Sequence, residues 1–228
     1  MRILLAALLV AFAALIGAPA RAADMPDYPD IEIPEVDYGL SGSFYLRGSA
    51  AGNLLWTREH VDTLGCVCLS PAAPGYGYSI GAGFGYEVGN GFRVDVTTDY
   101  LHNAGLTDGT NVLELRGGVA LANAYYDFNF SGEPMSGGWG GYVGAGLGGA
   151  YYQTSVTGGA PIADGDGWSP VVAGMAGVQY DMGNIVADVG YRLMYLPQIS
   201  NNTPGAASFY LNDNTVHEVR GTLRYRFQ

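Results

Sequence analysis

Strict alternation of apolar and polar residues is the feature that most constrains what this chain can fold into. Residues 78–88 (YSIGAGFGYEV) carry Tyr, Ile, Ala, Phe, Tyr and Val at every second position, with Ser, Gly and Glu between them. Successive side chains of a β-strand point to opposite faces, so this stretch predicts a strand with one apolar face. Gly-Asn-Gly follows at 89–91, and the alternation resumes over 92–100. Because Asn-Gly favours tight hairpin turns, we expect the two strands to pair in antiparallel fashion.

Six further segments show the same alternation with less contrast, which predicts eight strands in all. They cover about 43–54, 112–128, 139–152, 168–181, 185–195 and 215–228. The connections alternate in length, with long ones at about 55–75, 101–111, 153–167 and 196–213 and shorter ones at 89–91, 129–138 and 182–184. An even number of antiparallel strands with short turns at one end and long loops at the other is the plan of outer-membrane barrels. The expected fold class is all-β, an eight-stranded antiparallel up-and-down transmembrane β-barrel over residues 39–228.

The amino-terminal segment has the pattern of an export signal. Arg2 precedes an apolar run at 3–16, and Ala20-Arg21-Ala22 forms an A-x-A cleavage site. This run is too short to span a bilayer, so the pattern predicts a signal peptide over residues 1–22 rather than a membrane anchor or a buried helix. Residues 23–38 are rich in proline and acids. We expect an extended periplasmic tail there.

Composition bears on which face of the strands is inside. All ten basic residues are arginine and the chain has no lysine, although water-facing surfaces normally carry many lysines. Aromatic residues near the ends of the apolar rows are typical of the lipid-facing surface of a membrane barrel. A soluble barrel would instead bury the apolar rows and expose the polar ones. The composition and the aromatic residues favour lipid outside and polar residues in the lumen.

With that assignment, the polar rows hold equal numbers of basic and acidic residues. The basic ones are Arg47, Arg93, Arg116, Arg192, Arg220, Arg224 and Arg226. The acidic ones are Glu87, Asp95, Asp99, Glu114, Asp181, Asp188 and Glu218. Buried charges are tolerated when they are paired and hydrogen-bonded. We therefore expect a structural network of Arg–Asp and Arg–Glu pairs that closes the lumen. On the strand over 112–128, this assignment puts Leu113, Leu121 and Tyr125 against lipid.

Cys66 and Cys68 are the only cysteines, and they are separated by one residue. A disulfide is allowed in an exported protein, but a ring this small is strained. Two free thiols and an intermolecular link remain as alternatives. Metal binding is the least favoured alternative, because no histidine or further cysteine accompanies the pair at ligand spacing.

The carboxyl-terminal residues continue the alternating register. Tyr225 and Phe227 belong to the apolar row of the last strand, and Gln228 follows them. We interpret Tyr225 and Phe227 as an assembly signal for insertion into the outer membrane. Gln228 would then be one extra residue beyond it.

Four groups of short motifs extend over nearly the whole mature chain. They are GSFYLRG at 42–48, NAYYDF at 123–128, GYR at 190–192, and HEVR with LRYRF at 217–227. They resemble motifs of the alphaproteobacterial RopB-like outer-membrane proteins, small eight-stranded barrels related in fold to the OmpA transmembrane domain. The resemblance implies a surface-exposed structural barrel without known catalytic residues. Gln228 departs from the pattern, because members of such families typically end on an aromatic residue.

Residues with catalytic potential are few. A nucleophile–histidine–acid set around His217 would need Ser208 or Thr215 together with Glu218 or Asp213. Serine and threonine are common in loops and the spacing specifies nothing, so ordinary polar loop residues are the simpler interpretation. We assign no catalytic, cofactor-binding or metal-binding residue and expect no cofactor.

The expected function is a structural or surface-interaction role in the envelope of a Gram-negative bacterium, with the loops displayed as in a surface antigen. The expected partners are outer-membrane lipid, lipopolysaccharide and the outer-membrane assembly machinery. The net charge of −11 argues against nucleic acid as a partner. A narrow porin-like channel is a second hypothesis, and a lipid-modifying barrel enzyme a third.

Overall fold

The computed structural model describes residues 42–62, 74–107, 110–130, 137–158, 163–202 and 209–227. The expected signal peptide at 1–22, the tail at 23–38, Cys66, Cys68 and Gln228 lie outside the described residues. The eight strands are β1 Ser43–Asp62, β2 Gly75–Glu87, β3 Phe92–Thr107, β4 Val112–Asn129, β5 Gly138–Thr157, β6 Gly165–Asp181, β7 Ile185–Ser200 and β8 Phe209–Arg226. No helix in the described part of the chain is long and apolar enough to cross a membrane.

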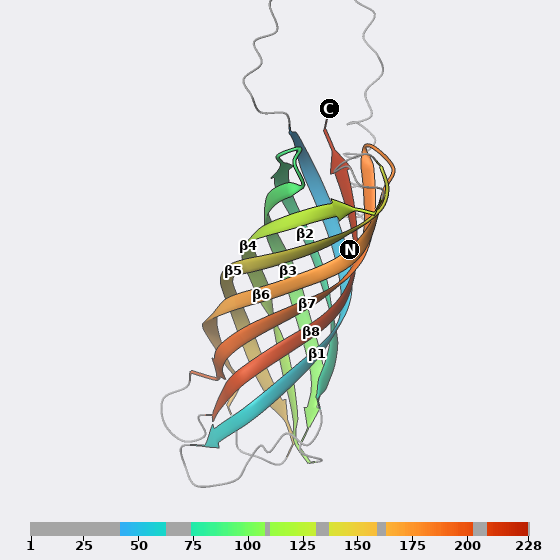
Figure 1. Ribbon diagram of the computed structural model, residues 1–228. Coiled ribbons are helices and arrows are strands. Elements are labelled where there is room, and N and C mark those ends of the chain that lie inside the picture. The colour runs from blue at the N-terminus through green and yellow to red at the C-terminus, as the bar shows by residue number, and fades with distance from the viewer. Residues whose placement is uncertain are drawn as a thin grey trace, which may run out of the picture. The chain divides into compact units, whose positions relative to one another are not determined.

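The strands close into one barrel, in which each strand pairs antiparallel with the next (Figure 1). The last strand returns to the first, with Arg224 of β8 opposite Arg47 of β1. Closure gives every strand two neighbours, so no sheet edge with unpaired backbone groups is left. The predicted fold class, an all-β barrel of eight antiparallel up-and-down strands, is confirmed.

The hairpin predicted from the strongest alternation is present. Glu87 at the end of β2 lies opposite Arg93 of β3. Gly89 and Gly91 in the turn have φ values of 86° and 91°, which glycine adopts without steric penalty. The Asn90 side chain accepts a hydrogen bond from the backbone N–H of Phe92 at 3.1 Å. The local sequence therefore specifies this turn.

The two ends of the barrel differ in their connections. We call one end the turn end, where the strands are joined by residues 88–91, 130–137 and 182–184. We call the other the loop end, where they are joined by residues 63–74, 108–111, 158–164 and 201–208. β1 begins and β8 finishes at the turn end.

The strands run further toward the loop end than the sequence predicted. β3 continues to Thr107 and β7 to Ser200, so most of the expected long connection at 101–111 is strand. In this region several outward residues are polar, for example Gln153 and Asp166. Apolar alternation therefore fades although the backbone pairing continues.

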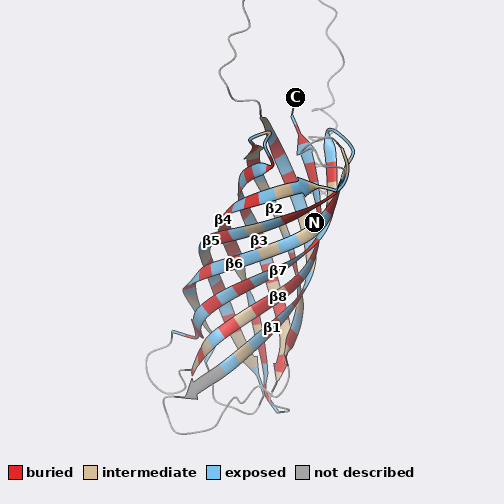
Figure 2. Ribbon diagram, in the orientation of Figure 1, coloured by how far each residue is buried: buried red, intermediate tan, exposed pale blue. Residues whose placement is uncertain are grey.

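Buried and exposed residues alternate along the strands (Figure 2). On seven strands the apolar row faces outward as predicted; Val189 of β7 and Val219 of β8, for example, are each 65% exposed. The opposite row, which includes Arg192 and Arg220, is buried in the lumen. These seven strands have lipid-compatible outer faces, and their inner faces are polar or glycine-rich toward the turn end and mostly apolar toward the loop end.

β4 is the exception, and the faces predicted for it are wrong. Leu113, Leu121 and Tyr125 are 1–3% exposed and point into the lumen. Arg116 is half exposed, and its guanidinium pairs with Glu114 at 2.9 Å on the outer face. The expectation that Glu114 and Arg116 belong to the lumen network is therefore corrected.

Strand pairing explains the face of β4. The inward residue Asp99 of β3 lies opposite Val119 of β4, and directly opposed residues share a face. The middle of the outward row of β4 consequently consists of Gly118, Ala120, Ala122 and Ala124, which are all exposed. Hydrophobicity alone points to the wrong face here, because the large apolar residues fill the lumen and the small ones face outward.

Candidate functional site

The lumen is the part of the barrel that gathers the chemistry-bearing side chains. Its turn-end part, which we call the polar half, holds arginines, carboxylates and tyrosines. Its loop-end part, which we call the apolar half, holds the main hydrophobic cluster. Together the two halves decide whether a solute or ion can pass through the barrel.

Four charged residues from three strands meet at the centre of the barrel. Arg192 of β7 contacts Asp99 of β3 at 2.7 Å and Glu218 of β8 at 2.6 Å. Arg220 of β8 contacts the other oxygen of Asp99 at 2.7 Å and Glu218 at 3.4 Å. The Ser79 hydroxyl also donates to Glu218 at 2.8 Å. The side chains of the four charged residues are at most 5% exposed, so they form a closed square of two cations and two anions.

A second group surrounds Asp95 of β3. Its carboxylate accepts hydrogen bonds from Arg47 at 2.8 Å, from the Tyr45 hydroxyl at 2.8 Å and from the Asn123 amide at 2.7 Å. Arg47 also donates to the Tyr125 hydroxyl at 2.9 Å. Tyr125 and Asn123 both come from β4, so the reversed face of that strand supplies partners to the network.

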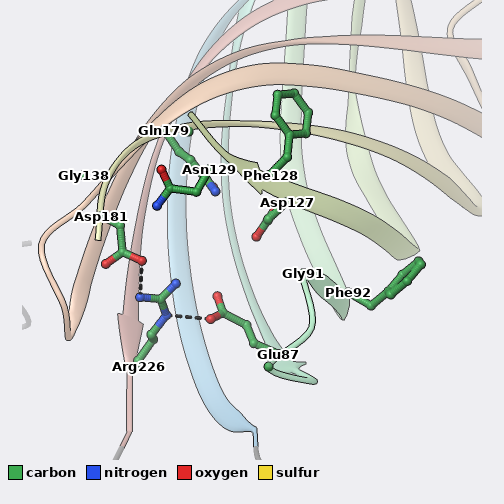
Figure 3. A pocket seen from close by; sticks show the side chains of 12 residues that line it. Glu87, Gly91, Phe92, Asp127, Phe128, Asn129, Gly138, Gln179, Asp181 and Arg226 are labelled. Carbon is green, nitrogen blue, oxygen red and sulfur yellow. Dashed lines mark hydrogen bonds and ion pairs between the residues drawn. The ribbon is translucent and has the colours of Figure 1, made fainter. Parts of the chain in front are cut away.

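The third group closes the turn end. Arg226 bridges Glu87 and Asp181 at 2.6 Å each (Figure 3). Arg224 contacts Glu87 at 2.6 Å and Asp127 at 3.4 Å. The cavity at this mouth measures only about 20 Å³, roughly the space that holds one water molecule.

Asp127 is a member that sequence reasoning missed. It faces the lumen from β4 and accepts from the Arg93 Nε at 2.8 Å. The Arg93 guanidinium also stacks 3.7 Å from the centre of the Tyr125 ring, a cation–π contact. The assignment of β4 to the wrong face hid both residues. The sequence signal that would have identified the lumen face of β4 is the alternating row of small residues at 118, 120, 122 and 124.

Asp188 differs from the other predicted carboxylates. It is 6% exposed and accepts a hydrogen bond from the Tyr142 hydroxyl at 3.2 Å. Within the described barrel no arginine forms an ion pair with it. The structure thus places twelve of the fourteen predicted network residues in the lumen, eleven of them in ion pairs.

Glycines on the inner face of β2 make room for this network. A Cβ added to Gly81 would lie 1.9 Å from an Asp99 oxygen, and one added to Gly85 would lie 2.6 Å from the Tyr45 ring. A larger residue at either position would push on charged or aromatic side chains that have no free space. The glycine-rich run at 81–85 is therefore a packing feature of the lumen.

The apolar half fills the rest of the lumen with tightly packed side chains from all strands except β2. Its members are Leu55, Leu101, Leu106, Leu113, Leu115, Val119, Leu121, Ala150, Tyr152, Val171, Ala173, Met194, Leu196, Ile199, Phe209, Leu211 and Val216. The cavity among them is again about 20 Å³. This half resembles the core of a soluble protein rather than the wall of a water-filled pore.

Among the residues considered for catalysis, Glu218 lies on the opposite side of the barrel wall from His217, Asp213 and Thr215, and Ser208 lies outside the described residues. Glu218 points into the lumen, whereas the side chain of its neighbour His217 contacts the Tyr191 hydroxyl on the outer face. Asp213 accepts a hydrogen bond from the Tyr195 hydroxyl at 2.6 Å. Adjacent strand residues point to opposite faces, so Glu218 cannot orient His217.

The predicted assembly residues lie at the turn end on the outer face. Tyr225 and Phe227 are 48% and 46% exposed, and their rings are 5.3 Å apart. The backbone N–H of Phe227 donates to the carbonyl of Phe44 in β1 at 2.8 Å. Phe227 therefore takes part in the seam at which β8 closes on β1. Its role as an assembly signal stays a prediction.

No protein-family model and no curated protein matches this sequence. Among solved structures, Neisserial surface protein A is 22% identical, with a TM-score of 0.55 over 81% of this chain and 97% of its own. The attachment invasion locus protein Ail of Yersinia pestis is 16% identical, with a TM-score of 0.47 over 82% of this chain and 99% of its own. Outer membrane protein OprG of Pseudomonas aeruginosa is 15% identical, with a TM-score of 0.45 over 82% and 97%. The chain therefore has the closed, eight-stranded, all-antiparallel barrel fold seen in outer-membrane protein structures.

Proposed function

We propose that this chain is an integral outer-membrane β-barrel of a Gram-negative envelope, with a structural and surface-interaction role. The observation that carries the proposal is a lumen filled along its length, first by ion pairs and then by apolar side chains. Such an interior rigidifies the wall and leaves the loop end as the part that meets the exterior.

The outer surface supports residence in a membrane. Apolar side chains project from every strand; Ile80, Leu147 and Leu223, for example, are 60–65% exposed. A soluble monomer rarely exposes a contiguous apolar surface of this extent. Aromatic residues occupy the outer face toward both ends, among them Phe92 near the turn end and Trp168 near the loop end. Two aromatic girdles around an apolar band are the mark of outer-membrane barrels.

The lumen supports a structural role over a porin-like channel. Cavities of about 20 Å³ at the turn-end mouth and in the apolar half each admit about one water. Between them, Arg192 and Arg220 are fixed by two carboxylates. A continuous ion path would require both the ion-pair square and the leucine cluster to separate. Conduction would therefore need a rearrangement of the packed interior.

Outer-membrane lipid and lipopolysaccharide are proposed to surround the barrel, and the outer-membrane assembly machinery is proposed to insert it. The motifs similar to RopB-like proteins agree with this role. The loops at the loop end would be the surface-exposed segments. No reaction is assigned to the chain.

Two measurements on the full chain test the proposal. Cell fractionation with heat-modifiable gel mobility is expected to find a folded barrel in the outer membrane, and a soluble periplasmic protein would contradict it. Purified barrel added to planar bilayers is expected to leave the conductance unchanged. Discrete conductance steps that scale with protein concentration would instead favour the narrow channel.

A further inference from the structure

The outer face of β4 differs from the outer faces of its neighbours. At one level near the loop end, β3 and β5 present Tyr100 and Tyr151, and both lie opposite Gly118 of β4. The next outward residue of β4 toward the loop end is Arg116. The aromatic girdle therefore has a gap at β4, and a cation lies directly beyond the gap.

A polar hollow of 380 Å³ opens on the outer face around this cation. It is lined by Arg116, Gln153, Thr154, Ser155, Asp164, Gly165 and Asp166. Arg116 is half exposed; one of its nitrogens contacts Glu114 at 2.9 Å. The carboxylate of Asp166 accepts from the Tyr151 hydroxyl at 2.9 Å, which fixes one wall of the hollow to the girdle. The hollow thus offers cationic and amide donors on one side and carboxylate acceptors on the other.

An apolar groove lies below the hollow on the same face. A Cβ added to Gly118 would meet nothing within 4 Å, so the surface is open immediately beneath Arg116. Further along β4, Ala122 and Ala124 form the floor of a groove of 670 Å³, with Val96 and Leu147 among its walls. Small residues on β4 and at Ala145 of β5, between Val96 of β3 and Leu147 of β5, produce this shape.

The spacing between the hollow and the groove suits one leaflet of a membrane. Arg116 and Ala122 are six residues apart, which is about 20 Å along a strand. With a strand tilt of roughly 40°, the depth along the membrane normal is about 15 Å. Half of a hydrocarbon core is also about 15 Å thick. An acyl chain that starts beside Arg116 would therefore reach the groove.

The geometry points to a docking site for a phosphorylated glycolipid of the outer leaflet, the lipid A class, on the outer face of β4. Arg116 would bind a phosphate group through its free N–H groups. Gln153 and the carboxylates of Asp164 and Asp166 would bind hydroxyl and amide groups of the sugar. An acyl chain would lie over Gly118 and the alanines. The inference rests on the outer-membrane residence proposed above.

The charges favour this occupant over a simple phospholipid. Arg116 is the one cation that lines the hollow, and it also pairs with Glu114, so it suits a single phosphate group bound through its remaining N–H groups. Asp164 and Asp166 repel further phosphate and can accept hydrogen bonds from neutral sugar hydroxyls. A headgroup with a saccharide between its charged groups satisfies both. A phosphodiester headgroup without a sugar leaves the carboxylate side of the hollow unused.

The test is native mass spectrometry of the full-length folded barrel, released from detergent in the presence of EDTA. Three probe lipids are used: lipid A, lipid A with its phosphates removed, and phosphatidylglycerol. Lipid A is expected to give the most abundant adduct, and the dephosphorylated lipid at least about tenfold less, which corresponds to about 1.4 kcal/mol. Equal adducts for lipid A and either of the other lipids would overturn the proposed recognition.

Two variants and one matched control locate the site. Arg116→Gln is expected to reduce the lipid A adduct about tenfold, in line with the loss of a charge-assisted hydrogen bond. Gly118→Leu fills the open position below the cation and is expected to reduce the adduct while Arg116 remains. Arg58→Gln is the control. Arg58 is the other outward-facing arginine of the described strands, and it lies on β1 two residues after the exposed Trp56.

Heat-modifiable mobility measured on each preparation separates the two proposals. If the barrel folds in the outer membrane but the Arg116→Gln variant binds lipid A as well as wild type does, only the proposed docking site is contradicted. An equal loss with Arg58→Gln would show general electrostatic attraction and would also contradict it. A chain absent from the outer membrane would instead contradict the proposed function.

Discussion

Replacing Asp99 with asparagine is expected to destabilise the barrel strongly. The Asp99 carboxylate is fully buried and accepts hydrogen bonds from Arg192 and Arg220 at 2.7 Å each. Asparagine keeps the volume but removes the charge, so Glu218 alone would face two guanidinium groups. Two charge-assisted hydrogen bonds contribute about 1.5–3 kcal/mol each. Breaking a buried ion pair by removing one partner costs roughly 3–5 kcal/mol, so we expect a loss in that range.

The assay is reversible urea unfolding of the barrel in lipid vesicles, followed by tryptophan fluorescence. The free energy of unfolding and the m-value are compared with those of wild type, because a similar m-value shows that the same surface is exposed. Glu114→Gln is the matched control. It also removes a carboxylate that pairs with an arginine, but the pair lies on the outer face with Arg116 half exposed. A shift of about 0–1 kcal/mol is expected there.

The double variant Asp99→Asn/Arg220→Gln sharpens the test. Removing one arginine together with the carboxylate restores the balance of one cation to one anion at the centre. The double variant is therefore expected to be more stable than Asp99→Asn alone. If Asp99→Asn shifts the free energy of unfolding no more than Glu114→Gln does, the central ion pairs do not stabilise the barrel and the reasoning fails.

Three further predictions concern other parts of the barrel. Leu121→Ala is expected to lower the free energy of unfolding by about 2–5 kcal/mol, because it leaves a cavity in the apolar half; no change in the same urea titration would show a loosely packed interior. Gly190→Ala is expected to destabilise more than Gly221→Ala, because an added Cβ would lie 2.0 Å from a lumen tyrosine hydroxyl at Gly190 but meets nothing within 4 Å at Gly221. Phe227→Ala is expected to reduce the heat-modifiable fraction in the outer membrane, whereas deletion of Gln228 is not. Equal assembly of these last two variants would refute the role given to the terminal aromatic residue.

Much of the fold could be predicted because the strands of a membrane barrel encode their faces locally. Alternation over 78–100 and the Asn-Gly turn predicted the antiparallel hairpin that β2 and β3 form. The carboxyl-terminal row of Arg220, Arg224 and Arg226 pointed to a charged lumen. These signals are local, since each depends on the environment of one strand and the geometry of one turn.

β4 could not be predicted in the same way. Its leucines look like a lipid-facing row, and Glu114 with Arg116 looks like a lumen row. Pairing with β3 determines the opposite arrangement, because Asp99 and Val119 oppose each other and must share a face. The error removed Asp127 and Tyr125 from the expected network and added Glu114 and Arg116 to it.

The sequence by itself determined the number of strands, their order, the closed antiparallel plan and most of the charged residues of the lumen. Only the tertiary structure decided which carboxylate binds which arginine, because Asp99 of β3 is far along the chain from Arg192 of β7 and Arg220 of β8. It also decided that the loop-end lumen is apolar. Hydrophobicity identifies a residue that avoids water, but lipid and a packed interior satisfy that requirement equally, and only the positions of neighbouring strands distinguish them.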